Sequence, residues 1–193
     1  MALLSCRLTV VVAMLALVSL GAASRPAEAI TIGGPGVNPG DFRITTFKSG
    51  LNFPYGIQVL SDGSLLVATS RPNDPNDLFG FFDSVGEVVR LVDSNGDGVA
   101  DSSSVLYTGL PGVLTGLAVA GDLVFVTSSA TGGEQISVLR MGATPAAPLT
   151  LVGALAFTFP GGWWHTTHGL AVRQIAAQTW ELFFNVGSDA NNS

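Results

Sequence analysis

One short segment carries oxygen-bearing side chains at the spacing of a calcium-binding loop. It reads Asp93-Ser94-Asn95-Gly96-Asp97-Gly98-Val99-Ala100-Asp101. Side-chain oxygens at its first, third and fifth positions can converge on one ion, and the glycine at its sixth position permits a sharp turn. The seventh position offers a backbone carbonyl, and the ninth can ligate directly or through water. The candidate calcium ligands are therefore Asp93, Asn95, Asp97, Val99 and Asp101.

The context of this segment argues against an EF-hand. Position 12 is Ser104, so the bidentate glutamate is missing, and no helical periodicity flanks the segment. We therefore expect a loop between two strands, in which calcium would have a structural role. The alternative is an ordinary turn without metal, because Asp, Asn and Gly dominate turns regardless of ions.

Both histidines of the chain lie in a second segment, Trp163-Trp164-His165-Thr166-Thr167-His168. Imidazole titrates near neutral pH, so His165 is a candidate general base. A His-x-x-His pair could also bind zinc, but no further His or Cys follows the leader to complete such a site. A hydrogen-bonded histidine in a loop beside structural tryptophans remains the third interpretation.

The elements that position these segments are predicted to be strands. Short runs of β-branched and aromatic residues are bounded by Gly, Asp, Ser and Pro, and helical periodicity is missing. One four-residue pattern, a glycine, an apolar residue, any residue and a valine, occurs three times and opens a repeated unit each time. It begins at Gly56, Gly116 and Gly169. A turn follows in the first two units and a longer loop, up to Trp180, in the third; each unit then has a second strand that ends in small polar residues. The fold class is therefore all-β with an internal repeat.

The repeat predicts a partial β-propeller. The three glycines are 60 and 53 residues apart, and each interval holds two further strand candidates, which makes four strands per repeat. These candidates are 86–92 and 105–108 in the first interval, and 135–141 and 149–159 in the second. A β-sandwich with coincidentally similar hairpins is the alternative. The chain holds about two and a half such blades, fewer than a closed propeller needs. We therefore expect an amino-terminal part of a larger propeller.

The amino end has the layout of a secretory signal peptide. Arg7 precedes an apolar run to Ala23, and Ala27-Glu28-Ala29 has the form of a cleavage site, with Ala22-Ala23-Ser24 as an alternative. A membrane anchor would need a longer run. The expected organisation is a signal peptide at 1–29, an extended Gly/Pro-rich arm without regular structure at 30–41, and the incomplete propeller at 42–193.

The charge balance of the chain limits the kinds of partner that it can bind. The chain has 8 Lys and Arg residues against 14 Asp and Glu, a net charge of −6. This balance argues against nucleic acid as a ligand. We expect a secreted or periplasmic protein that leaves the membrane after cleavage of its leader.

Three stretches together resemble the opening blades of glucose/sorbosone dehydrogenases, a family related to soluble quinoprotein glucose dehydrogenases. They are Asn52–Ile57 with Ser61–Val67, Gly86–Leu91 leading into the loop at Asp93, and His165-x-x-His168-Gly169-Leu170 with Asn185–Ser188. The resemblance covers about residues 42–192. Propellers of the NHL and strictosidine-synthase-like kinds share part of the first phrase.

This resemblance implies a six-bladed propeller that oxidises a sugar hydroxyl with pyrroloquinoline quinone and calcium. His165 matches the family's base, which would take the hydroxyl proton as hydride passes to the quinone. The chain departs from the family at His168, at Arg173–Thr179 and at Ser188. No quinone ligand can be carried over, because the family's ligands lie in later blades, and the fragment alone is expected to be inactive. The alternative is a non-catalytic exported propeller that binds carbohydrate or a protein partner.

Overall fold

A computed structural model describes residues 33–42, 44–74, 83–130, 133–157 and 169–185, and it divides the chain into two units after Ile44. The described part of the first unit holds one short 3-10 helix, η1, at Pro39–Asp41. The Asn38 side chain caps it by accepting a hydrogen bond from Gly40 N at 3.2 Å. Proline at the first helical position favours this turn. The expectation of an arm without regular structure was therefore wrong at these three residues.

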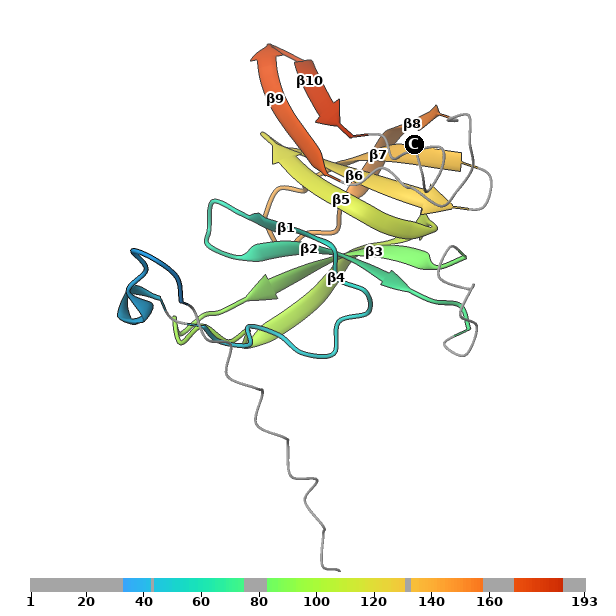
Figure 1. The fold of residues 1–193 in the computed structure, drawn as a ribbon. Coiled ribbons are helices and arrows are strands. Elements are labelled where there is room, and N and C mark those ends of the chain that lie inside the picture. Colours follow the sequence, from blue (N-terminus) through green and yellow to red (C-terminus); the bar gives the residue numbers. More distant parts are fainter. Residues whose placement is uncertain (1–32, 43, 75–82, 131–132, 158–168, 186–193) are drawn as a thin grey trace, which may run out of the picture. The chain divides into compact units, whose positions relative to one another are not determined.

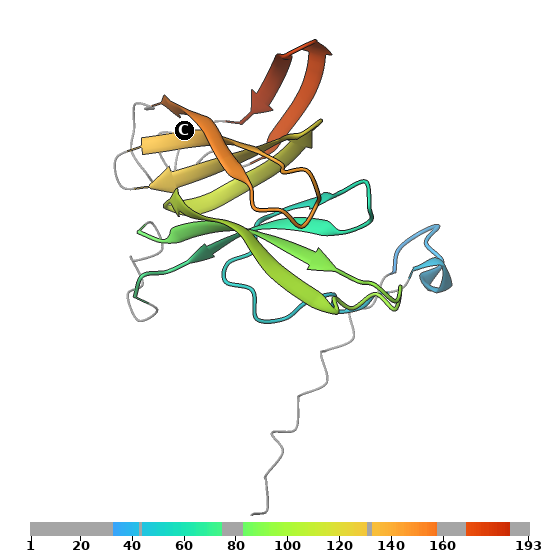
Figure 2. The ribbon, with the colours of Figure 1, turned by 180° about the vertical axis from the view of Figure 1, so that it is seen from behind.

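The described part of the second unit is all-β, in three antiparallel sheets (Figure 1). The first sheet has four strands in chain order: β1 (Gly56–Val59), β2 (Leu65–Arg71), β3 (Val85–Val92) and β4 (Ser102–Pro111). The second repeats this order: β5 (Val113–Ala120), β6 (Leu123–Ala130), β7 (Gly133–Arg140) and β8 (Thr150–Phe157). The third is a hairpin of β9 (Leu170–Ala176) and β10 (Thr179–Phe184). The two four-stranded meanders can be followed from behind in Figure 2.

Alternation along the strands divides their side chains between two faces of each sheet. One core cluster joins the first two sheets, with members such as Leu66 and Val88 from the first and Leu117 and Val126 from the second. A second cluster lies between the second sheet and the hairpin, and it includes Phe125. The second sheet is therefore packed on both of its faces.

A third, smaller cluster covers part of the outer face of the first sheet. Val67, Val89 and Leu91 are buried there under Phe47 and Leu51 from the segment that precedes β1. The backbone of this segment is also tied to the loop between β3 and β4, because Ala100 N donates to the Phe47 carbonyl at 2.8 Å.

The third repeat differs from its prediction. The sequence suggested a longer loop between Val172 and Trp180, but β9 continues to Ala176 and a two-residue turn of Ala177 and Gln178 leads directly into β10. Gln178 has a φ of 58°, the left-handed conformation that such a tight turn requires. Arg173 and Glu181 pair across the two strands at 2.6 Å, which helps to extend the hairpin.

Candidate functional site

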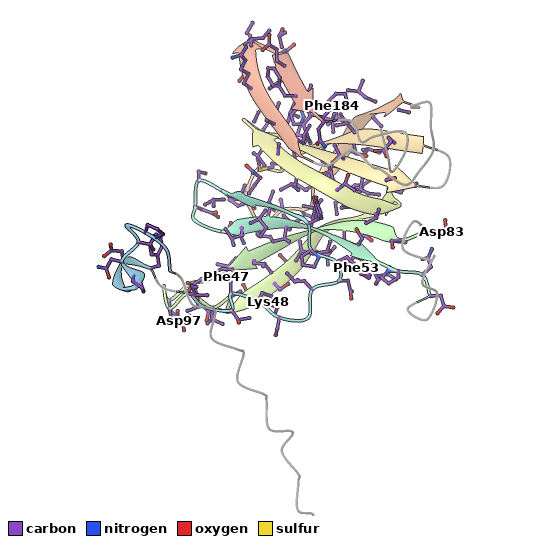
Figure 3. All side chains as sticks on the ribbon, in the orientation of Figure 1. Phe47, Lys48, Phe53, Asp83, Asp97 and Phe184 are labelled. Atoms are coloured by element: carbon purple, nitrogen blue, oxygen red, sulfur yellow. The ribbon has the colours of Figure 1, made fainter. Side chains whose placement is uncertain are left out.

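The predicted calcium loop connects β3 to β4, where Figure 3 labels Asp97. Gly96 and Gly98 have φ values of 75° and 85°, so both need the left-handed freedom of glycine. The Asp93 carboxylate accepts hydrogen bonds from both of their backbone N–H groups, at 2.7 and 2.8 Å. Asp93 therefore organises the turn from its first position.

The side-chain oxygens of Asn95, Asp97 and Asp101 also accept hydrogen bonds from backbone N–H groups of the loop. Asn95 Oδ1 accepts from Asp97 N at 2.9 Å, and Asp97 Oδ1 accepts from Val99 N at 2.8 Å. Asp101 Oδ2 accepts from both the backbone N–H and the hydroxyl of Ser94, each at 2.6 Å. These two Ser94 hydrogen bonds lower the pKa of the Asp101 carboxyl, because they stabilise its charged form.

The structure places all five predicted ligands in one exposed loop, where the side chains of Asp93, Asn95, Asp97 and Asp101 accept hydrogen bonds from other loop residues. Among the residues that the structure describes, no three His, Cys, Asp or Glu side chains form a group that could hold a metal ion. An ionised carboxylate has about four lone-pair sites, so accepting N–H groups leaves capacity for a cation. The geometry thus explains the Asx pattern as turn chemistry, and the calcium assignment stays a prediction.

The predicted base, His165, lies outside the described residues, as do His168 and the two tryptophans before it. The description resumes at Gly169, directly before β9, the strand of the third repeat that corresponds to β1 and β5. A base at His165 would therefore stand five residues before Leu170, the first residue of this strand.

Sequence reasoning missed a polar cluster at the turn between β1 and β2. The Asp62 carboxylate accepts from the Ser64 hydroxyl at 2.6 Å and from the Arg90 guanidinium at 2.7 Å, and Arg90 also donates to Ser64 Oγ. Hydrogen bonds from Ser64, followed by those from Arg90, lower the pKa of Asp62 to about 2. A similar contact occurs in the second sheet, where Asp122 of the turn between β5 and β6 pairs with Arg140 of β7 at 3.4 Å.

The four arginines in the described part of the chain all have a carboxylate partner within 4 Å. The pairs are Arg71–Glu87, Arg90–Asp62, Arg140–Asp122 and Arg173–Glu181. Pyrroloquinoline quinone is a polycarboxylate, so holding it calls for cationic donors that are not already neutralised. Lys48 is the one described basic side chain outside these four pairs. One lysine does not make up the set of cationic donors that a polycarboxylate needs, so the described residues do not fit this cofactor, and no reaction step through it can be derived from them.

A cleft of about 430 Å³ lies beside the turn that joins β5 to β6. Its lining mixes apolar and polar groups: Val59, Leu60, Ser61, Val119, Gly121, Asp122, Met141, Gly142, Ala143, Thr144 and Pro145. This volume is in the range of small-molecule sites. Among the described residues that line it, none is aromatic or basic, so they offer neither the stacking surface that sugars favour nor a partner for an anionic ligand.

Comparison with models of protein families, with curated protein sequences and with solved structures gives no match for this chain. Within its described residues, no helix is long and apolar enough to cross a membrane. The resemblance to glucose/sorbosone dehydrogenases therefore rests on the sequence motifs alone, and no family is assigned.

Proposed function

We propose that the two four-stranded sheets and the hairpin are consecutive blades of a β-propeller. The observation that carries this proposal is the packing of the second sheet, which buries Leu117 against the first sheet and Phe125 against the hairpin. A β-sandwich has two sheets around one core, whereas propeller blades are packed on both faces. The meander order of the strands, repeated from one sheet to the next, supports the same interpretation.

The sheet-to-sheet contact itself repeats, which further supports a propeller. A Cβ placed on Gly56 would lie only 2.7 Å from Cβ and N of Leu117, and one placed on Gly116 would lie 3.4 Å from Cβ of Leu170. Gly56 thus lets the second sheet approach closely at Leu117, and Gly116 lets the hairpin approach closely at Leu170. Leu117 and Leu170 each follow the opening glycine of their own unit. A regular contact of this kind, carried from sheet to sheet, is what a radial array of blades requires.

The function proposed for this propeller is that of an exported sugar dehydrogenase of the glucose/sorbosone type. Support comes from the sequence motifs and from the place of His165, shortly before the first strand of the third repeat. In this role the His165 imidazole takes the proton from the sugar hydroxyl that is oxidised. The described residues do not supply the groups that would hold the electron acceptor. Calcium in the loop at Asp93 has a structural role in this proposal.

The test compares the protein encoded by the complete reading frame with the 193-residue chain. Each is supplied with pyrroloquinoline quinone, calcium and an aldose, and dye reduction is followed. We expect turnover by the complete product, loss of about a hundredfold or more in His165→Ala, and a smaller effect in the matched variant His168→Ala. A reading frame that stops at Ser193, or turnover that survives His165→Ala, would overturn the dehydrogenase proposal.

A further inference from the structure

Exposed apolar side chains lie on the outer face of the first sheet. Ile57 and Val59 are 60% and 70% exposed. They pair in register with Val67 and Leu65, so they share the face that points away from the second sheet. Phe47 and Leu51 cover only the part of this face over β2 and β3. We call the part on β1, with Ile57 and Val59, the N-face.

The outer face of the hairpin has a similar character. Leu170, Val172, Trp180 and Leu182 pack toward the second sheet. Because side chains alternate along a strand, the residues at the alternate positions of β9 and β10 point away from that sheet. These include Ile175 and Phe183, which are 52% and 53% exposed. We call this surface the C-face.

The repeat relates these two faces to each other. Ile57 follows its glycine as Leu117 and Leu170 follow theirs. Leu117 is covered by the first sheet and is 4% exposed, and Leu170 contacts the second sheet. Among the described residues, Ile57 is therefore the one member of this series that no preceding sheet covers. The second sheet packs against Leu170 with the face that it turns toward the hairpin. The C-face is the corresponding face of the hairpin.

The charges on the two faces do not oppose their contact. The N-face side of the first sheet carries the Arg71–Glu87 pair, at 3.5 Å, and the C-face carries the Arg173–Glu181 pair, at 2.6 Å. The Arg173 guanidinium also lies 5.5 Å from the centre of the Phe183 ring. Although the chain has a net charge of −6, these four charged side chains form neutral pairs, which lowers the electrostatic barrier to association of identical chains.

We propose that, in the 193-residue chain taken by itself, the N-face is an interface for a second copy of the same chain, which docks onto it with the C-face. In a complete propeller, another sheet of the same protein would occupy the N-face instead. The contact would continue the established sheet-to-sheet interface across two chains. Such an interface is heterologous, because each copy contributes a different surface, and it produces dimers that can extend further. This proposal is independent of any dehydrogenase activity.

The first experiment measures the molar mass of the purified 193-residue chain by light scattering over a range of concentrations. We expect a rise in mass that Ile57→Asp weakens by about tenfold or more in dissociation constant, because a charge would be buried in the interface. Phe183→Asp should act in the same way. Leu151→Asp is the control, since Leu151 is also an exposed apolar residue, at 46%, but lies on the outer strand β8. Circular dichroism verifies that each variant is folded.

Mixing the two variants tests the head-to-tail geometry. The Ile57→Asp copy keeps its C-face and the Phe183→Asp copy keeps its N-face, so an equimolar mixture should form a one-to-one dimer while each variant alone stays monomeric. A wild-type chain that remains monomeric throughout would overturn the proposal. It would also be overturned by a mixture that stays monomeric, or by an equal loss of association in Leu151→Asp.

Discussion

The Asp62 carboxylate fastens the turn between β1 and β2 to a neighbouring strand. Ser64 and Arg90 together hold the pKa of Asp62 at about 2, below its ordinary value of 3.8. A lowered pKa in the folded state stabilises the fold above the ordinary value, and this contribution is lost as pH falls from about 4 towards 2. Because the side chain is one-third exposed, screening by solvent reduces this contribution to about 1 kcal/mol.

Asp62→Asn should therefore lower the free energy of unfolding by about 1 kcal/mol at neutral pH. The difference from the wild type should vanish as pH falls from about 4 to 2, which denaturant titrations at several pH values can measure. Asp122→Asn is the matched control, because its pair with Arg140 is longer, at 3.4 Å, and both side chains are more than half exposed. A difference for Asp62→Asn that stays constant down to pH 2 would contradict the assigned role of the carboxylate.

The Asp93 carboxylate stands at the first position of the candidate calcium loop. It accepts two loop amides and is the first proposed calcium ligand. If the loop binds calcium, adding the ion should raise the melting temperature of the wild type, and Asp93→Asn should lose most of that rise, because calcium prefers charged oxygen ligands. Asp74→Asn, outside the loop, should keep the rise. An equal calcium effect in the Asp93 and Asp74 variants would show that the loop is a turn without metal.

At the scale of the strands, the close approach of β1 to β5 depends on a glycine. Gly56→Ala places a methyl group 2.7 Å from Cβ and N of Leu117, so the two sheets must shift apart. Overpacking of this kind costs about 1–3 kcal/mol, measurable as a loss in the free energy of unfolding. Gly153→Ala on β8 is the control, because its added methyl group meets no atom within 4 Å. Equal stability of the two variants would contradict the proposed sheet-to-sheet contact.

The strand pattern was largely predictable, because short β-branched runs between turn residues have few alternatives. The predicted strands at 56–59 and 86–92, for example, match β1 and β3 within one residue. The hairpin of the third repeat was mispredicted, because Arg173 and Gln174 read as loop residues until their cross-strand partners are known. Likewise, Asp62 and Arg90 are 28 residues apart, and only the register of β2 against β3 brings them together.

At the scale of the whole second unit, the repeated contact between sheets explains more than any single site does. The charged groups named above have structural roles, because the carboxylates of the Asp93 loop accept loop amides and the described arginines pair with carboxylates. The candidate base, by contrast, could be proposed only from its place in the sequence. The proposed function therefore depends on whether the sheets belong to a propeller.

An experimental structure of the protein encoded by the complete reading frame tests this central claim most directly. The account predicts four-stranded sheets arranged around one axis, with a glycine-to-apolar contact between neighbouring sheets and with Ile57 covered by another sheet of the same kind. Two sheets closed around a single core, with Ile57 still facing solvent, would contradict it.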